Sequence, residues 1–350
     1  MKIYLRLFML LAFLATLAVP VRAADSPDLA RALDWLLTHQ QPDGGFTTGF
    51  TAGSDLGATV DVILAAVAVG ADPRTWAPSP LDYLRAQVES GAVTDAADWS
   101  RVVLGAVALD ADPRALGGAD AVSALLAAQD PDTGQFGASL FAHAYALLAL
   151  HNAGVAPPQP AVDRLLAAQT EDGAWPMNPG DEVDTNTTAL AVQALAALGE
   201  IDAAQRARPY FRAMQNADGG FPWQKPSDYG TETDANSTAV VVQALVALET
   251  SLDAWEAEGG TPHTALAALQ AEESGGFQWQ AAVPGPNVLA TAQAIQALAG
   301  LHLAALPVAE TAAPAAGAAQ LPETGGFYPG GFLILAGLAA LLAGLTLRKA

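Results

Sequence analysis

The residues with the clearest chemical potential form two matching stretches in the second half of the chain. Residues 184–189 read DTNTTA and residues 234–239 read DANSTA. An Asp before a run of small residues caps a helix well, because its carboxylate accepts hydrogen bonds from first-turn N–H groups. We therefore expect Asp184 and Asp234 to be helix caps, with catalysis or ligand contact as the alternative. The polar residues that follow them could line a cavity: Asn186, Asn236, Thr188 and Thr238.

Other candidates are scattered. His143 stands where the matching stretches have Thr and is followed by Tyr145, so it is either a buried core histidine or a base or ligand contact. Asp61 and Glu232 are the acids that could replace a missing proton donor. Four aromatic residues fall outside the repeat pattern described below and could line a pocket mouth: Trp99, Trp223, Tyr229 and Trp279.

No metal or cofactor is expected. The chain has no Cys, which excludes disulfides, thiolate metal sites and Cys nucleophiles. The acids of its Asp-Gly pairs are single and lack an oxygen-rich loop, which is typical of turns rather than of calcium sites.

A recurring phrase of Gln, three residues, Gly, one residue and an aromatic organises the chain. Its Gln recurs every 40 to 55 residues, at Gln40, Gln87, Gln129, Gln169, Gln215 and Gln270. Two copies carry one inserted residue, and the copy after Gln87 has Val93 in the aromatic place. Periods of this length indicate a supersecondary unit used repeatedly.

Each unit predicts two helices. The segment before each Gln is amphipathic, whereas runs such as residues 190–198 and 240–248 are apolar nearly all round. A helix that is apolar on all sides must be buried. We therefore predict an all-α, α6/α6 toroid over residues 25–305, with six inner and six outer helices. An open superhelix is the alternative, but it would leave a face of each second helix in water.

The phrase at Gln40, Gln169 and Gln215 resembles the QW repeat of the prenyltransferase and squalene cyclase α/α-toroid superfamily, over about residues 28–303. The resemblance implies the toroid fold and a central cavity. It also implies an acidic Asp-x-Asp-Asp motif in cyclases, but Asn186 and Asn236 take the place of the acid. Prenyltransferases use a zinc site with Cys, which this chain cannot provide.

The two ends predict export and anchoring. A basic start and an apolar run to Val19 are typical of a signal peptide over residues 1–23, cleaved after Ala23 or Ala24. Residues 306–320 are an Ala/Pro-rich spacer. Residues 321–350 resemble a sortase sorting signal, with LPETG, an apolar segment over residues 331–347 and a basic tail. This implies cleavage between Thr324 and Gly325 by a sortase-type transpeptidase, with a retained membrane span as the alternative.

Composition limits the classes of partner that the protein can bind. The formal net charge of −21 disfavours nucleic acid, because an acidic surface repels phosphates. We expect an extracellular protein anchored to the cell envelope, in contact with membrane only through its C-terminal segment. It would bind a small apolar or amphipathic ligand, isoprenoid or corrinoid-like, without the usual cyclase acid. The alternatives are an enzyme of the terpene cyclase/prenyltransferase superfamily, a carbohydrate-active α/α-barrel, or a protein-interaction module.

Overall fold

The computed structural model describes residues 27–48, 53–228 and 230–307. All of these belong to one compact unit, which extends to Glu310. The predicted signal peptide, the sorting signal and all but the first two residues of the spacer lie outside the described residues. Among the residues that are described, no helix is long and apolar enough to cross a membrane.

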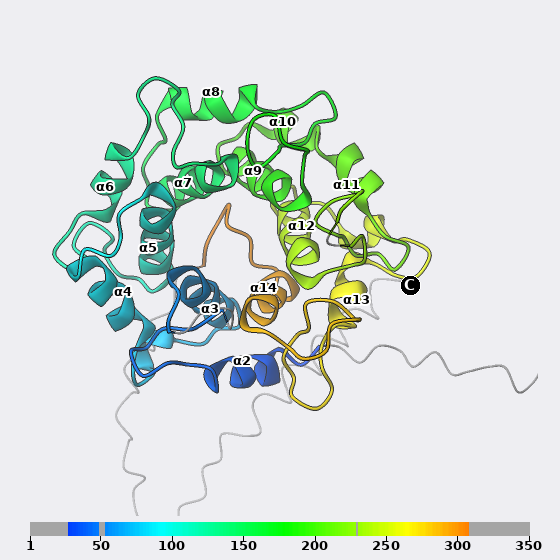
Figure 1. The fold of residues 1–350 in the computed structure, drawn as a ribbon, viewed down its shortest axis with the longest axis horizontal. Helices are drawn as coiled ribbons and strands as arrows, with labels where there is room; N and C mark the ends of the chain where they lie inside the picture. The colour runs from blue at the N-terminus through cyan, green and yellow to red at the C-terminus, as the bar shows by residue number, and fades with distance from the viewer. Residues whose placement is uncertain (1–26, 49–52, 229, 308–350) are drawn as a thin grey trace, which may run out of the picture. The chain divides into compact units, whose positions relative to one another are not determined.

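The described chain is helical, with no strand, and its helices form two concentric rings (Figure 1). The inner ring contains α3 (Leu56–Ala68), α5 (Ala96–Ala108), α7 (Leu140–Asn152), α9 (Thr185–Ala197), α12 (Ala235–Ala247) and α14 (Val288–Leu298). The outer ring contains α2 (Leu29–Leu37), α4 (Pro80–Glu89), α6 (Ala121–Ala127), α8 (Gln159–Ala167), α11 (Arg208–Met214) and α13 (Pro262–Ala267). A short extra helix, α10 (Ile201–Gln205), precedes α11, and 3₁₀ turns cover Pro73–Thr75 and Leu252–Trp255.

The inner ring is closed. Each inner helix packs against its two neighbours, and α14 packs against α3 to complete the circle. The toroid prediction is therefore confirmed and the open superhelix is not formed. Burial follows the sequence pattern: α9 buries ten of its residues, whereas α2 buries only Ala32 and Leu36. The frequent Ala residues let the inner helices pack closely, because they add little bulk between the helix axes.

In four of the six units, those of Gln40, Gln169, Gln215 and Gln270, the repeat Gln joins its unit to the next. Gln169 Nε2 donates to the carbonyl of Gly173 in its own turn at 2.9 Å, and to that of Ala203 in the next unit at 2.9 Å. Gly173 has φ of +80°, and an added Cβ would lie 2.0 Å from the carbonyl oxygen of Arg206. Only Gly fits there, because both the backbone conformation and the close approach exclude a side chain.

The repeat aromatics are held by the helix that follows them. Trp175 is fully buried, and its backbone N–H donates to Thr188 Oγ1 at 3.0 Å. The same bond joins Phe46 to Thr59, Phe221 to Thr238, Phe277 to Thr291, and Phe136 to His143 Nδ1. The fourth residue of these inner helices therefore points outward, toward the repeat turn.

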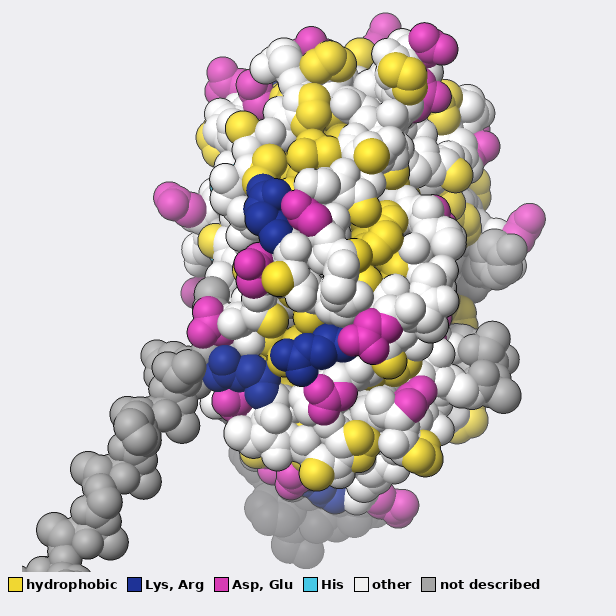
Figure 2. All heavy atoms as spheres, turned by 90° about the vertical axis from the view of Figure 1, so that its left-hand side faces the viewer, with side chains coloured by type: hydrophobic (Ala, Val, Ile, Leu, Met, Phe, Trp, Pro, Cys, Tyr) yellow, Lys and Arg dark blue, Asp and Glu magenta, His cyan; other side chains and the backbone are white. Residues whose placement is uncertain are grey.

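Figure 2 shows the side that carries α4 and α6, where basic side chains lie beside acidic ones and hydrophobic side chains are interspersed. Salt bridges on α4 and beside α6 join Arg85 to Asp82 at 2.9 Å and Arg114 to Asp120 at 3.4 Å. No extended basic surface is visible on this face, in keeping with the acidic composition.

Gln270 closes the ring, which makes it a test of the repeat bonds. Its Nε2 donates to the carbonyls of Gly275 and Asp28, both at 2.8 Å, and its Oε1 accepts from Asp28 N–H at 2.9 Å. Gln270→Ala should lower the free energy of unfolding by about 1–3 kcal/mol, because it leaves backbone groups unpaired. Urea denaturation measures this loss.

Gln87→Ala is the matched control. Gln87 belongs to the degenerate unit, and its side chain forms no hydrogen bond with the other described residues. Its removal should change the free energy of unfolding by less than about 0.5 kcal/mol. Equal losses in the two variants would show that the Gln bridges do not hold the ring together.

Candidate functional site: the open end of the inner ring

The outward direction of the fourth residue fixes which residues face the centre of the ring. With 3.6 residues per turn, the second, sixth and ninth residues of an inner helix lie nearly opposite the fourth. The second residues are Gly57, Ala97, Phe141, Asn186, Asn236 and Leu289. The sixth residues are Asp61, Arg101, Tyr145, Leu190, Val240 and Gln293. The ninth residues are Leu64, Leu104, Leu148, Gln193, Gln243 and Gln296.

Exposure falls steeply along this face. The second residues are all partly exposed, as are four of the sixth residues: Asp61, Arg101, Tyr145 and Gln293. The ninth residues are at most 2 % exposed. Solvent therefore enters the ring at the N-terminal ends of the inner helices and reaches the sixth residue, where the interior closes.

The chain's own C-terminal segment closes the opposite end. After α14, residues 299–307 turn back across the ring, drawn in orange in Figure 1. Leu301 and Leu303 are buried there. Asn152 Nδ2 donates to Leu303 O at 2.7 Å, and Leu303 N–H donates to Gln193 Oε1 at 2.8 Å. Only the N-terminal end is thus left open.

A hydrogen-bond chain links three inner helices at this open end. Asn236 Nδ2 donates to Gln293 Oε1 at 2.8 Å, and Gln293 Nε2 donates to Asp61 Oδ2 at 3.1 Å. Gln296 Nε2 donates to the backbone carbonyl of Asp61 at 2.8 Å. Asp61 is therefore held in place by α14, and one of its carboxylate oxygens is engaged.

Asp61 is also electrostatically unusual. Burial raises its pKa to about 6, although the Gln293 hydrogen bond and the charge of Arg101 work in the other direction. Burial and the charge of Asp61 together raise the pKa of Tyr145. An added Cβ on Gly57 would lie 3.0 Å from Arg101 Nε, so the guanidinium lies against the Gly57 backbone. We call Asp61, Arg101, Tyr145, Asn236 and Gln293 the mouth cluster.

The mouth cluster can do two things chemically. It presents amide, hydroxyl and guanidinium donors beside an acid, which suits a ligand with a polar head. A carboxyl with a pKa near neutrality is also the kind of group that can donate a proton. Among the described residues, no group of three or more His, Asp or Glu is arranged to hold a metal ion.

Asp184 and Asp234 are helix caps, as expected. Asp184 is 1 % exposed and accepts from Thr187 N–H at 2.7 Å; Asp234 is 3 % exposed and accepts from Ser237 N–H at 2.7 Å. Burial raises the pKa of both carboxyls, that of Asp234 to about 6. They lie at the starts of α9 and α12, outside the mouth cluster, and Thr188 and Thr238 bond the repeat aromatics instead of facing the cavity.

His143 is part of the repeat packing. It is fully buried, its Nδ1 accepts from Phe136 N–H at 2.9 Å, and its Nε2 lies 2.9 Å from the carbonyl of Ala161. Because Nδ1 accepts, Nε2 carries the proton and donates it to that carbonyl. Burial lowers the pKa of His143 to about 4.

The remaining candidates are dispersed. Trp223 and Trp279 are partly buried, and their carbonyls accept from the first N–H of α9 and of α12 at 2.9 and 2.8 Å. Trp99 is the outward fourth residue of α5. Glu232 is exposed and lines a surface groove with α13. Tyr229 lies outside the described residues, as do Thr324 and Gly325.

The structure therefore brings together Asp61, Tyr145 and Asn236 from the predicted set, with Asn186 on the same face. It adds Arg101 and Gln293, which sequence reasoning did not single out. The sequence could have revealed both residues, because each is the sixth residue of its inner helix, at the same repeat position as Asp61 and Tyr145.

Comparison with known proteins agrees with this architecture. The prenyltransferase alpha-alpha toroid domain matches residues 3–269, so this chain belongs to that family. A search of curated proteins gave no match.

Solved structures share the fold at low identity. The type II terpene cyclase MstE from Scytonema has a TM-score of 0.59 at 15 % identity, over 77 % of this chain and 96 % of that one. An unsaturated glucuronyl hydrolase from Bacillus sp. GL1 has a TM-score of 0.57 at 16 % identity, over 77 % of this chain and 93 % of that one. Protein geranylgeranyltransferase-I from Candida albicans has a TM-score of 0.53 at 11 % identity, over 78 % of this chain and 91 % of that one. Enzymes of different chemistry thus use this fold, and function has to be argued from the site.

The raised pKa of Asp61 gives a stability test. The folded state holds this proton up to about pH 6, whereas an ordinary Asp loses it near 3.8. The protonated carboxyl thus favours folding below 3.8, and this contribution is lost as the pH rises through 6. Asp61→Asn keeps an acceptor for Gln293 but does not ionise. Relative to wild type, it should gain up to about 3 kcal/mol between pH 4 and pH 7 in urea titrations. A gain no larger than that of the exposed-site control Asp253→Asn would contradict the burial of this charge.

His143 gives the opposite pH dependence. Its folded-state pKa lies below its ordinary value of 6.5, so wild type loses stability as the pH falls from 6.5 toward 4. His143→Thr keeps an acceptor for Phe136 but loses volume and the bond to Ala161. It should cost about 2 kcal/mol at pH 7, and the deficit should narrow at pH 5. Thermal and urea unfolding at both pH values measure the gap, and a pH-independent gap would rule out a buried neutral imidazole.

Proposed function

We propose that this protein is a ligand-binding toroid that takes up a small amphipathic molecule at the open end of its inner ring. The observation that carries the proposal is the fall in exposure between the sixth and ninth residues of the inner helices. The recess proposed here would be open at this end and closed at the other by packed side chains and residues 299–307. A closed floor suits capture of a small molecule better than passage through the ring.

The lining supports an amphipathic ligand. Polar groups cluster on α3, α5, α7, α12 and α14, whereas the partly exposed Phe141 and Leu289 supply apolar surface at the second level. Such a mixture, apolar with a few convergent polar groups, is typical of small-molecule sites. The ligand's polar head would bind the mouth cluster, and its apolar part would contact Phe141 and Leu289, which lie on opposite helices of the ring. Isoprenoid or corrinoid-like molecules are the classes that the family resemblance favours.

The same proposal places the protein outside the cell. The signal peptide and the LPETG segment support export and covalent attachment by a sortase-type transpeptidase between Thr324 and Gly325. The ring would then be presented on the cell envelope, with the Ala/Pro-rich spacer between them.

A second candidate function is catalysis by Asp61, favoured by its pKa of about 6. Asp61 would act as the proton donor that Asn186 cannot be. The other catalytic alternative, a carbohydrate-active barrel using Asp184 or Glu232, has less support, because one is a buried cap and the other lies on the outer surface.

Native mass spectrometry of the full-length protein from its own host, followed by lipid extraction, tests the leading proposal. Wild type should retain a molecule, and Ala97→Trp, which fills the recess at its second level, should lose it. Ala92→Trp is the matched control, because Ala92 is exposed and precedes α5. A molecule retained equally by all three proteins would place the ligand elsewhere.

Product analysis separates the second candidate from the first. Purified protein would be incubated with squalene and with geranylgeranyl diphosphate, and the extracts examined by gas chromatography and mass spectrometry. Pure binding predicts unchanged substrate. If wild type forms cyclised products and Asp61→Asn does not, the binding proposal is wrong and catalysis by Asp61 is supported.

A further inference from the structure

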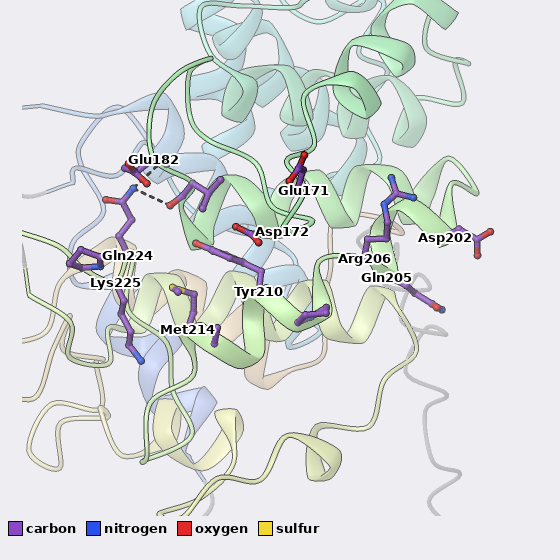
Figure 3. A pocket seen from close by; sticks show the side chains of 14 residues that line it. Glu171, Asp172, Glu182, Asp202, Gln205, Arg206, Tyr210, Met214, Gln224 and Lys225 are labelled. Carbon is purple, nitrogen blue, oxygen red and sulfur yellow. Dashed lines mark hydrogen bonds between the residues drawn. The ribbon is translucent and has the colours of Figure 1, made fainter.

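A groove on the outer surface carries a second inference. It has a volume of about 1070 Å³ and lies where the repeat turn of the fourth unit meets the outer helices of the next unit. In Figure 3, Asp202 and Arg206 lie at one end, Glu182 and Gln224 at the other, with Tyr210 and Met214 between them. This groove is separate from the recess inside the ring.

The groove has an apolar floor. Val183, Pro209, Ala213, Met214 and Pro226 contribute side chains that are partly or fully exposed, and Tyr210 is buried beneath them. Small-molecule sites usually enclose most of their ligand, but most residues that line this groove are exposed. An open groove of this kind suits a segment of polypeptide better than an enclosed small molecule.

Its rim carries uncompensated negative charge. Glu171, Asp172, Glu182 and Asp202 are all exposed, and none forms a salt bridge with another residue that the structure describes. The lining also contains two cations, which bond neutral groups and keep their charge, so four acids against two bases leave a formal net charge of −2. Arg206 donates to Gln169 Oε1, and Lys225 Nζ donates to the carbonyl of Gln215 at 3.2 Å. The groove therefore complements a cationic partner.

The groove is repeated. One unit further along, a smaller groove of about 660 Å³ is lined by residues at equivalent places in the repeat. Asp218 corresponds to Asp172, Glu232 to Glu182, and Leu269 to Met214. The second groove has Ala217 in place of Glu171 and no counterpart of α10. The first groove is thus the larger of two equivalent grooves between repeats. Its four acids and two bases, and the two acids of the second groove, give both a formal net charge of −2.

We propose that these two grooves bind an extended segment of a partner protein in which basic and apolar residues alternate. Side chains of an extended chain point alternately to opposite sides. The apolar ones can therefore pack on the floor while the basic ones reach the acidic rim. The larger groove is the principal site, and the second lies in the next repeat, where a longer segment would continue.

The test is fluorescence polarisation with the full-length protein and a labelled peptide, Gly-Lys-Val-Lys-Val-Lys-Gly. Binding should weaken severalfold between low salt and about 0.3 M sodium chloride, because exposed charge pairs are screened. The same peptide with Glu in place of Lys should not bind. Equal binding of the two peptides, or no binding of the basic one up to about 1 mM, would overturn the proposal.

Two variants locate the site. Ala213→Arg adds bulk and positive charge to the groove and should reduce affinity at least about tenfold, because it blocks the floor and repels the peptide. Glu171→Gln with Glu182→Gln keeps shape and removes two rim charges, which should cost about threefold to tenfold at low salt. Glu89→Gln with Glu272→Gln is the matched control, since both residues are exposed and lie outside the grooves.

The outcomes are exclusive. Losses confined to the groove variants, with unchanged melting temperatures, support the proposal. A loss of the same size in the control pair would show attraction to the overall negative charge, and the proposed docking site would then be wrong. If Ala213→Arg fails to fold, the isosteric Glu-to-Gln pair still decides between these results.

Discussion

The ring is held by one hydrogen-bonding pattern, present in four of its six units, in which the side chain of a repeat Gln joins a Gly turn of its own unit to the backbone of the next. The bond matters because the inner helices are too apolar to exist without neighbours on both sides. Gln270 bonds Asp28 in the same way, so the last unit is joined to the first. Closure buries the final apolar face, which an open array would leave in water.

That closure also creates the site. Because five of the six inner helices are anchored outward through their fourth residue, the second and sixth residues of the inner helices converge on the ring axis. Evolution can then change a residue at one of these levels without disturbing the anchoring. The result is an asymmetric mouth, with Asp61, Arg101 and Tyr145 on three consecutive inner helices and Leu190 and Val240 on the next two.

The repeat, the helical pairs and the closed ring could be predicted from the sequence, because buried apolar helices and Gly turns produce periodic sequence patterns. The N-caps at Asp184 and Asp234 were also predictable, since capping is a local interaction. The mouth cluster was only partly predictable. Asp61 was one of several acids, and its pairing with Gln293 spans more than two hundred residues, so no local pattern reveals it. The closure of the ring by the segment with Leu301 and Leu303 was not predicted, because a short irregular segment has no periodic sequence pattern.

The departure from the cyclase motif has a physical reading in this geometry. Asn186 is a second residue of an inner helix, and its amide cannot supply a proton; its Oδ1 is buried and has no hydrogen-bond partner among the described residues. The acid with the raised pKa lies instead one turn deeper and on another helix, at Asp61, where desolvation keeps its proton to near neutral pH. In the proposed complex, Asp61 would contact the part of the ligand that reaches deepest, while Asn186 and Asn236 would contact the part nearest solvent. A ligand that satisfies both levels must be polar at more than one point along its length, which a simple hydrocarbon is not.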